Sequence, residues 1–498
     1  MSEPTAFDRA VTRHAAGEDH HALAAELVAQ MTIEEKLDGL DGDTDFWPGL
    51  LDMTSGGYHR HPWPAAAAGR LGIPGIDFVD GPRGCVVGPA TCFPVSMARG
   101  ATFDPDLEER IGDVIGAEIR AVGGTFTGAV CVNLLRHPGW GRAQETYGEE
   151  PYHVGEMGAA LTRGLQRHVL ACMKHFALNS MENARFTVDV SVDERALHEV
   201  YLPHFRRIAD EGVAATMSAY NSVNGRWCGD DPVLLTEILR DEWGWDGMVI
   251  TDFVFGLRDP AGSVLAGCDV EMPFRQQRAM ALREAMAEGT LAVDDVDRSV
   301  TRVVATLIRF ADRLGPPASP VALADPAHRE LALDAAVAGT VLLRNDGVLP
   351  VEAASLSTVA VLGRLADTPN LGDGGSSNVL QPDVVTPLRG LRDALPGVEV
   401  RHAIEDAAIA AGADLTVVVV GTTKDDEGEY IDAVGTAELM ALFPPPPDDT
   451  PAPVAESADT PAGAANGADA GDDGDAGFGP PERVRFAPGG DRRTLRLF

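Results

Sequence analysis

The sequence predicts an α/β protein whose larger part is a (β/α)8 barrel of the TIM type, followed by a smaller α/β unit. Chain length supports this, because 498 residues with 45% hydrophobic side chains exceed the material of one ordinary domain. Short apolar runs also alternate with helical periodicity from about residue 22 to 316, which is typical of a buried parallel sheet with crossover helices. An open doubly wound sheet would show the same alternation.

Five apolar runs are predicted to be barrel strands: GIDFVD (75–80), AVCVNLLR (129–136), VLACMKHF (169–176), VAATMSAY (213–220) and GMVITDF (247–253). Their carboxyl ends carry Asp80, Arg136, Lys174 with His175, Tyr220 and Asp252. In a parallel barrel these ends open onto one face, where catalytic groups from several strands meet. One such residue could simply mark the end of a strand, whereas five together favour the barrel and a site on that face.

The helices and the second unit follow from the same periodicity. Residues 1–316 form the predicted barrel domain, with helices over 104–123, 193–212, 232–244 and 299–314, and a Pro- and Ala-rich linker occupies 317–325. Residues 326–432 form the predicted second unit, with a helix running into a strand at 340–343 and strands near 357–363, 398–403 and 414–421.

The C-terminal part of the chain has a different composition. Residues 433–482 contain no Lys or Arg, and they repeat Ala, Asp, Gly and Pro. We expect this low-complexity segment to be disordered, because it offers few side chains that could form a core. Only residues 483–498 follow it.

Composition excludes several classes of protein. Forty Lys and Arg against 76 Asp and Glu give a net charge of −36, which argues against non-specific binding to nucleic acid or to anionic membranes. The sequence has no apolar run of about 18 residues that could span a membrane. Residues 1–21 are charged throughout and lack the apolar core of a signal peptide, so we expect a cytoplasmic protein.

The cysteines point to packing rather than to metal binding or disulfides. They show no C-x-x-C spacing, and the chain is long and carries no export signal, so we interpret them as small buried residues. They are Cys85, Cys92, Cys131, Cys172, Cys228 and Cys268.

Asp252, Lys174 and His175 are the first candidates for chemistry. Asp252 follows the buried run MVIT, where neighbouring cations could keep its carboxylate ionised as a nucleophile. The alternative is an Asp that caps the next helix.

Lys174 and His175 could hydrogen-bond a polar substrate. A Schiff-base lysine and a metal-binding histidine are the alternatives, although no further ligand with metal-site spacing is visible.

Arg142 lies in HPGWGRAQETYGEE (137–150), a loop in which aromatic and charged residues alternate. This combination suits a sugar, because its C–H faces stack on rings and its hydroxyl groups take charged hydrogen bonds. Trp140 by itself is interpreted as a packing residue rather than as a sugar platform.

These motifs together resemble glycoside hydrolase family 3, the β-glucosidase family. The similarity runs from MTIEEKL (31–37) to about Asp432. It is carried by DGPRG (80–84), NLLRHPGWGRAQETYGEEPYHVGEM (133–157), KHFALNS (174–180), MSAYNSVNG (217–225), WGWDGMVITDF (243–253) and GTVLLRNDGVLP (339–350). The resemblance implies a barrel followed by an α/β sandwich, with the active site between them. The sandwich is predicted to be incomplete, because family members continue it beyond residue 432; residues 483–498 would be its remnant and the chain a truncated form.

The resemblance also implies roles for individual residues. Asp252, in TDF where the family has S-D-W, corresponds to the nucleophile. The acid/base corresponds to Glu429 in TTKDDEGEYID (422–432), with Glu427 as the alternative. The residues implied to bind the sugar are Asp80, Arg142, Lys174, His175, Tyr220, Met217, Phe253 and Ser376, and Glu145 lies in the same motifs.

The implied activity is that of an exo-acting retaining β-glycosidase, with β-glucosidase as the default, acting on an oligosaccharide or other glycoside without metal or organic cofactor. β-Xylosidase, β-N-acetylhexosaminidase and an inactive truncated sugar-binding protein are the alternatives.

The double role of Glu429 as acid and base requires a raised pKa of its carboxyl group. Because the sandwich is incomplete, we also expect an exposed sheet edge or face and a poorly anchored loop around Glu429. Oligomeric state does not follow from the sequence.

Overall fold

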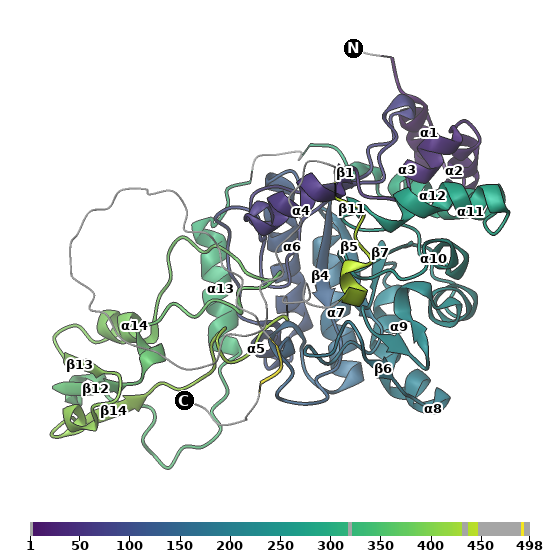
Figure 1. Ribbon diagram of the computed structural model, residues 1–498. Helices are drawn as coiled ribbons and strands as arrows, with labels where there is room; N and C mark the ends of the chain where they lie inside the picture. Colours follow the sequence, from purple (N-terminus) through teal and green to yellow (C-terminus); the bar gives the residue numbers. More distant parts are fainter. Residues whose placement is uncertain (1–2, 317–320, 431–436, 447–489, 493–498) are drawn as a thin grey trace.

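Residues 3–316, 321–430, 437–446 and 490–492 are described by the computed structural model. A large unit is built around a curled sheet with helices packed outside it, and a smaller unit with β12, β13, β14 and α14 lies to one side (Figure 1). The predicted α/β fold class, a barrel-type domain followed by a second α/β unit, is confirmed.

The main sheet has the strand order β10-β7-β5-β4-β3-β2. All neighbours pair in parallel except β2 and β3. The strands are β2 Trp63–Ala65, β3 Ile76–Phe78, β4 Phe126–Cys131, β5 Leu170–Phe176, β7 Ala215–Ser218 and β10 Met248–Ile250. Each of the five predicted runs overlaps one of the parallel strands, although β4 begins three residues before the run at 129–136. β4 and β5 are buried along their whole length because helices cover the outside of the sheet.

The two ends of this sheet are linked by short strand pairs and isolated bridges instead of by further long strands. The predicted regular eightfold repeat is therefore not found among the described residues. β1 (Thr44–Asp45) pairs with β11 (Phe274–Arg275), and isolated bridges join Gly42 to Ala65 and Ile250 to Val270. The backbone approach at Gly42 is so close that an added Cβ would lie 2.1 Å from the Pro273 carbonyl oxygen. Glycine is therefore needed there.

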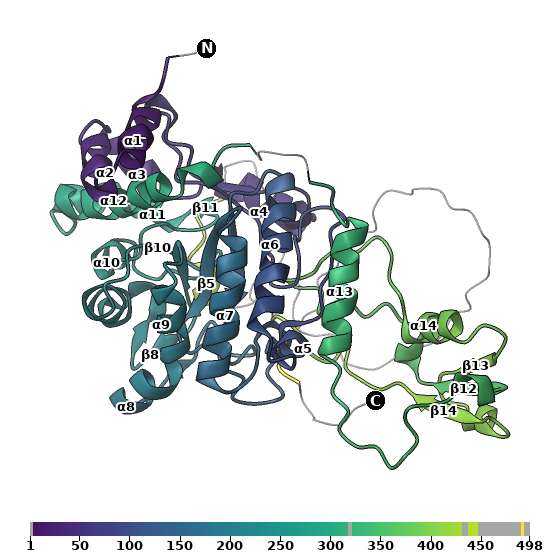
Figure 2. The same cartoon turned by 180° about the vertical axis from the view of Figure 1, so that it is seen from behind.

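Helices surround the sheet (Figures 1 and 2). α6 packs on α7, α7 on α9, and α12 on α2. The helices of this unit are α1 Ala6–Ala15, α2 His20–Val28, α3 Ile33–Asp38, α4 Phe46–Thr54, α5 Ser96–Gly100, α6 Pro105–Ala121, α7 Pro151–Leu165, α8 Glu194–Ala196, α9 Pro203–Asp210, α10 Pro260–Ala266, α11 Gln277–Glu288 and α12 Val293–Arg309. Residues Leu197–Tyr201 and Val233–Glu242 are π-helical, and β6 Asp189–Val190, β8 Ser222–Val223 and β9 Arg226–Trp227 form a small separate sheet.

All six cysteines are free thiols, and all but the half-buried Cys92 are buried, as predicted.

The smaller unit is a three-stranded parallel sheet of order β13-β12-β14, with α14 packed on it. Its elements are β12 Thr358–Leu362, β13 Glu399–Ala403, β14 Leu415–Val418 and α14 Pro387–Ala394. α13 (Pro326–Ala338) lies instead against α5 and α6 of the barrel unit. The predicted strand at 340–343 is wrong: these residues form no strand, and Leu343 is 92% exposed, because β13, β12 and β14 pair only with one another.

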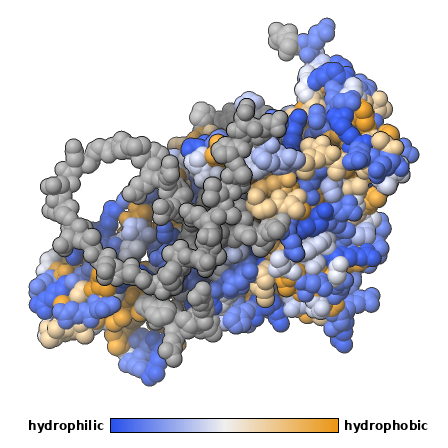
Figure 3. Space-filling view, in the orientation of Figure 1, coloured by the Kyte–Doolittle hydropathy of each residue, from blue (hydrophilic) through white to orange (hydrophobic). Residues whose placement is uncertain are grey.

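The edge of this small sheet is exposed, as expected. Val418 and Val420, at the end of β14, are 60% and 54% exposed. Hydrophobic side chains accordingly reach the surface of the smaller unit at the lower left of Figure 3.

The prediction of disorder is wrong for residues 437–446. α15 (Ala437–Met440) and the turn after it pack on the barrel unit, where Leu439 is buried and the Phe443 ring lies 4.8 Å from that of Phe46. The reason is that these few apolar side chains find an apolar surface at α4. The rest of the low-complexity segment lies outside the described residues. In the described part of the chain no helix has the length and apolar character needed to cross a bilayer.

Candidate active site

A cavity of about 770 Å³ opens at the carboxyl ends of the parallel strands. It brings together predicted residues from four strand ends, from the loop after β4 and from two later loops: Asp80, Arg142, Lys174, His175, Met217, Tyr220, Asp252, Phe253, Ser376 and Glu429. Arg136 is the exception among the predicted strand-end residues. It is exposed, lies 5.7 Å from the ring of Tyr201, and lines a separate cavity of about 180 Å³.

Asp80 and Lys174 form a buried ion pair on the floor of the cavity. Lys174 Nζ lies 3.0 and 2.9 Å from the two carboxylate oxygens of Asp80. Tyr58 donates a hydrogen bond of 3.0 Å to the same carboxylate. Burial raises the pKa of Asp80, and the Lys174 ammonium partly offsets that rise. The pair can present both a donor and an acceptor to the hydroxyl groups of a ligand.

Asp252 follows β10 by two residues and has one oxygen without a hydrogen-bond partner. The backbone N–H of Phe253 donates to its Oδ1 (2.8 Å), whereas the buried Oδ2 has no hydrogen-bond partner among the described residues and lies 3.5 Å from His175 Nε2. Burial raises the pKa of Asp252 to about 6, although the charges of Arg185, Arg142 and Lys174 oppose the rise. The helix-cap alternative does not apply, because Asp259 caps the next helix, α10.

His175 is held as a neutral ring by Asn133. The backbone N–H of His175 and its Nδ1 lie 2.9 and 3.2 Å from Asn133 Oδ1, while Asn133 Nδ2 donates to the His175 carbonyl oxygen. This arrangement places the ring proton on Nδ1, so Nε2 accepts from Arg142 Nη1 at 3.2 Å. Burial, together with the charges of Arg142 and Lys174, lowers the pKa of His175 well below its ordinary value.

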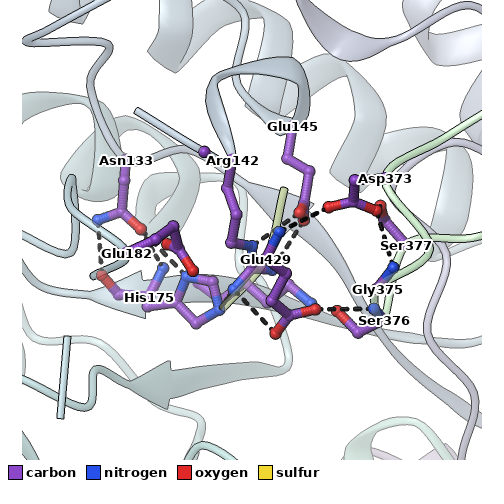
Figure 4. Close-up of polar contacts among 12 residues, drawn as sticks. Asn133, Arg142, Glu145, His175, Glu182, Asp373, Gly375, Ser376, Ser377 and Glu429 are labelled. Carbon is purple, nitrogen blue, oxygen red and sulfur yellow. Dashed lines mark hydrogen bonds and ion pairs between the residues drawn. The ribbon is translucent and has the colours of Figure 1, made fainter. Parts of the chain in front are cut away.

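Arg142 is oriented by Glu145 and reaches the second candidate carboxylate. Its Nε and Nη2 lie 2.7 and 2.8 Å from the two oxygens of Glu145 (Figure 4). Its Nη1 lies 3.6 Å from Glu429 Oε1. The bidentate pair fixes the plane of the guanidinium, so that Arg142 offers its remaining donors to the cavity.

Glu429 lies in the cavity and Glu427 does not. Glu429 accepts from Arg185 Nη1 (3.1 Å) and from the backbone N–H of Ser376 (2.7 Å). Glu427 instead accepts from Thr422 Oγ1 and pairs with Arg492. The geometry therefore favours Glu429 of the two candidates.

The raised pKa expected for Glu429 is not found. Burial alone would raise it, but Arg142, Arg185 and the Ser376 N–H hold the pKa of Glu429 well below its ordinary value. The sequence-based expectation counted the acidic neighbours Asp425, Asp426 and Glu427, and it missed the two guanidinium groups that come from the barrel unit.

The loop around Glu429 is anchored, contrary to the prediction. The backbone N–H of Glu429 donates to Asp373 (2.9 Å), and that of Tyr430 donates to Glu182 (3.1 Å). Arg185 also donates to the Tyr430 carbonyl oxygen. Contacts with the barrel unit thus supply the support that was expected only from a complete sandwich.

Two family profiles match this chain. The N-terminal domain of glycosyl hydrolase family 3 matches residues 62–306, and the C-terminal domain of the same family matches residues 340–443. The chain belongs to glycosyl hydrolase family 3.

Several β-glucosidases of known sequence or structure are similar to this family 3 chain. A β-glucosidase of Rhizobium radiobacter is 37% identical over 391 residues, which are 76% of this chain and 46% of that protein. β-Glucosidase 3B of Thermotoga neapolitana, solved with glucose, has a TM-score of 0.69 at 29% identity, over 78% of this chain and 55% of its own. DesR, a β-glucosidase of Streptomyces venezuelae solved with D-glucose, has a TM-score of 0.69 at 31% identity, over 76% of this chain and 50% of its own. The chain spans about half the length of the curated relatives it matches.

Sequence reasoning missed four polar residues of this family 3 site. Glu182 and Arg185 follow KHFALNS closely, and their spacing of three residues between opposite charges was the available signal. Asp373 lies in the GDGGSS loop beside Ser376, where it holds the backbone of Gly375 and Glu429. No local signal in the sequence connects Tyr58 with Asp80.

Proposed function

We propose that this chain is an exo-acting retaining β-glucosidase in which Asp252 is the nucleophile and Glu429 the acid/base. The observation that carries the proposal is Asp252 Oδ2, which accepts no hydrogen bond from the described residues and is buried in a cavity that also holds Glu429 and the Asp80–Lys174 pair. Similarity to β-glucosidases solved with glucose supports glucose as the sugar.

In the first half of the reaction, Asp252 Oδ2 attacks the anomeric carbon of a terminal β-glucosyl residue. The bond from that carbon to the leaving oxygen breaks, and Glu429 gives that oxygen a proton. In the second half, Glu429 takes a proton from water, the water oxygen attacks the anomeric carbon, and the ester to Asp252 breaks. The configuration of the released sugar is retained, because two inversions take place.

Substrate binding would have to change the surroundings of Glu429. The contacts with Arg142 and Arg185 favour its ionised form, which cannot donate a proton. A glucosyl hydroxyl that accepts a hydrogen bond from Arg142 Nη1 would weaken the 3.6 Å contact of this group with Glu429 and raise the pKa of Glu429 toward the range an acid needs. Arg142 and His175 would then act as sugar-binding residues and as a link between binding and protonation.

A mechanism-based trap tests the proposal. A 2-deoxy-2-fluoro-β-glucoside with a good leaving group should inactivate the protein, and mass spectrometry of the digested protein should place one glycosyl group on Asp252. Asp252→Asn should lose turnover by several orders of magnitude and take up no label. A label on another residue, or near-normal turnover by Asp252→Asn, would overturn the assignment.

The sugar is tested separately with 4-nitrophenyl β-glucoside, β-xyloside and N-acetyl-β-glucosaminide. The proposal expects the highest kcat/KM for the glucoside. If the xyloside or the N-acetylglucosaminide is hydrolysed faster, the sugar assignment is wrong although the mechanism stands. If none is hydrolysed, the chain by itself is not an active glycosidase.

A further inference from the structure

The active-site cavity has two chemically different halves. One half carries the charged residues around Asp252. The other is an apolar wall, which we define as Trp47, Leu50, Leu51, Met53, Phe255 and Phe443. Four of these residues belong to α4, and Phe443 follows α15.

Aromatic contacts and backbone hydrogen bonds hold the apolar wall in place. The Phe443 ring stacks on Phe255 at 5.7 Å and meets Trp47 edge-on at 6.1 Å. The indole N–H of Trp47 donates to the Pro445 carbonyl oxygen (3.0 Å), and Gln276 donates to the Leu442 carbonyl oxygen (3.0 Å). The polar group of Trp47 is therefore occupied within the protein and does not point to a ligand.

The wall contrasts with the floor of the same cavity in what it can offer a substrate. On the floor, the ion pair of Asp80 and Lys174 can satisfy sugar hydroxyl groups. Side chains of the wall provide no donor or acceptor that is free for a second sugar, so hydroxyl groups buried against it would lose their water without replacement. At its outer rim Leu51 is 72% exposed, so apolar surface faces solvent at the mouth of the cavity.

We infer that the wall is a binding site for an apolar, ring-containing aglycone, and that the preferred substrates are β-glucosides of such alcohols rather than disaccharides. This inference rests on the proposed function, because the glucosyl group must occupy the charged half. A cavity of about 770 Å³ lies in the size range that encloses both a sugar and a bulky aglycone. Flat rings would bury apolar area on Trp47 and Phe443 and would leave no hydroxyl group unpaired.

Turnover is compared among substrates whose leaving groups are all aliphatic alcohols: 2-phenylethyl β-glucoside, ethyl β-glucoside and cellobiose. Leaving-group chemistry is similar in the three, so kcat/KM reports binding of the aglycone. We expect kcat/KM for the phenylethyl glucoside to exceed that of the other two by about tenfold or more. Cellobiose turned over as well as or better than the phenylethyl glucoside would overturn the inference.

Leu51→Asn tests the wall itself, and Leu333→Asn on α13 is the matched control, because Leu333 is 61% exposed and lies outside the cavity. Leu51→Asn should reduce the ratio of kcat/KM for phenylethyl glucoside over ethyl glucoside about fivefold. Leu333→Asn should leave the ratio unchanged. An equal ratio in both variants and in the parent protein would contradict the assignment.

A binding experiment separates this inference from the proposed function. Calorimetric titration with the inert analogues 2-phenylethyl β-thioglucoside and thiocellobiose needs no turnover. Tenfold tighter binding of the phenylethyl compound supports the wall even if the chain hydrolyses nothing, which would sink only the proposed function. Equal affinities, or tighter binding of thiocellobiose, would overturn the inference even in an active enzyme.

Discussion

At the scale of residues, Asp252 and Glu429 are two buried carboxyl groups in opposite environments. Burial dominates at Asp252 and raises its pKa to about 6. At Glu429, Arg142, Arg185 and the Ser376 N–H outweigh burial, so its pKa falls. Environments that separate two carboxyl groups in this way are typical of acid–base sites. Here the surroundings favour a proton on the proposed nucleophile over one on the proposed acid.

The raised pKa of Asp252 makes its ionisation a cost to stability at neutral pH. The ordinary value is 3.8 and the folded value about 6, so the folded state binds the proton more tightly. Stability is therefore lost as the pH rises through this interval, by about 3 kcal/mol when the loss is complete. Asp252→Asn should raise the free energy of unfolding at pH 7.5 by up to that amount and give no such gain at pH 3.5.

Thermal or denaturant unfolding at the two pH values measures this effect. Asp312→Asn is the control, because the Asp312 side chain is 70% exposed and its removal should shift stability little at either pH. A gain for Asp252→Asn that is the same at both pH values would show that its charge is not the cause.

Glu429 and Glu427 are separated by chemical rescue. Glu429→Ala should slow substrates with poor leaving groups most, by about 10²- to 10⁴-fold, because they depend on a proton from the acid. Added azide should restore turnover of activated aryl glucosides by replacing the missing base. Glu427→Ala, which removes only the contacts with Thr422 and Arg492, should show neither effect; the reverse pattern would move the acid/base to Glu427.

At the scale of elements, residues 490–492 connect three loops of the site. The Asp491 carboxylate accepts from the backbone N–H groups of Gly141, Glu182 and Asn183, all at 3.0 Å. Gly490 bridges Gly428, next to Glu429. This short segment, which lies far along the chain from all three loops, thereby holds the loops of Arg142, Arg185 and Glu429 against one another.

Asp491→Ala should therefore lower kcat by roughly 10²-fold, since displacement of a catalytic group by about 1 Å can have that effect. Barrel folding should persist, because Asp491 contacts only loops. Activity on an aryl glucoside and the circular dichroism spectrum are the measurements. Asp346→Ala is the matched control, since Asp346 is exposed and pairs with the exposed Arg344. Unchanged kcat for Asp491→Ala would show that the loops hold their geometry without this segment.

At the scale of the whole molecule, the two units differ in how fully their sheets are covered. β5 is buried along its whole length, whereas β14 alternates between half-buried and exposed residues. The core of the smaller unit consists of four buried side chains, Val359, Val361, Ala366 and Leu388. A core of this size gives little protection against local opening.

Hydrogen exchange should therefore separate the units. Backbone amides of β5 (Leu170–Phe176) should exchange slowest, and those of β12 (Thr358–Leu362) and β14 (Leu415–Val418) should exchange orders of magnitude faster. Mass spectrometry of peptides that cover these strands is the measurement. Equal protection of β5 and β12 would mean that the three-stranded sheet is as stable as the barrel unit.

The sequence by itself determined the five parallel strands of the main sheet, helices such as α6 and α12, and the residues at the ends of those strands. Local periodicity reports which side chains are buried, and parallel strands bring their carboxyl ends to one face, so Asp80, Lys174 and Asp252 could be placed together in advance. The sequence-based prediction fails where strand pairing between distant segments determines the secondary structure. Residues 340–343 have the composition of a strand, yet the small sheet is formed by β13, β12 and β14.

Only the tertiary structure decided which glutamate enters the cavity and what surrounds it. Glu429 is separated by 244 residues from Arg185, which lowers its pKa, and Trp47 donates to Pro445 across 398 residues. No local pattern encodes such distances, because the electrostatic surroundings of a buried charge depend on which loops the fold brings together. For the same reason Phe443, in a segment of low complexity, became part of the wall of the active site.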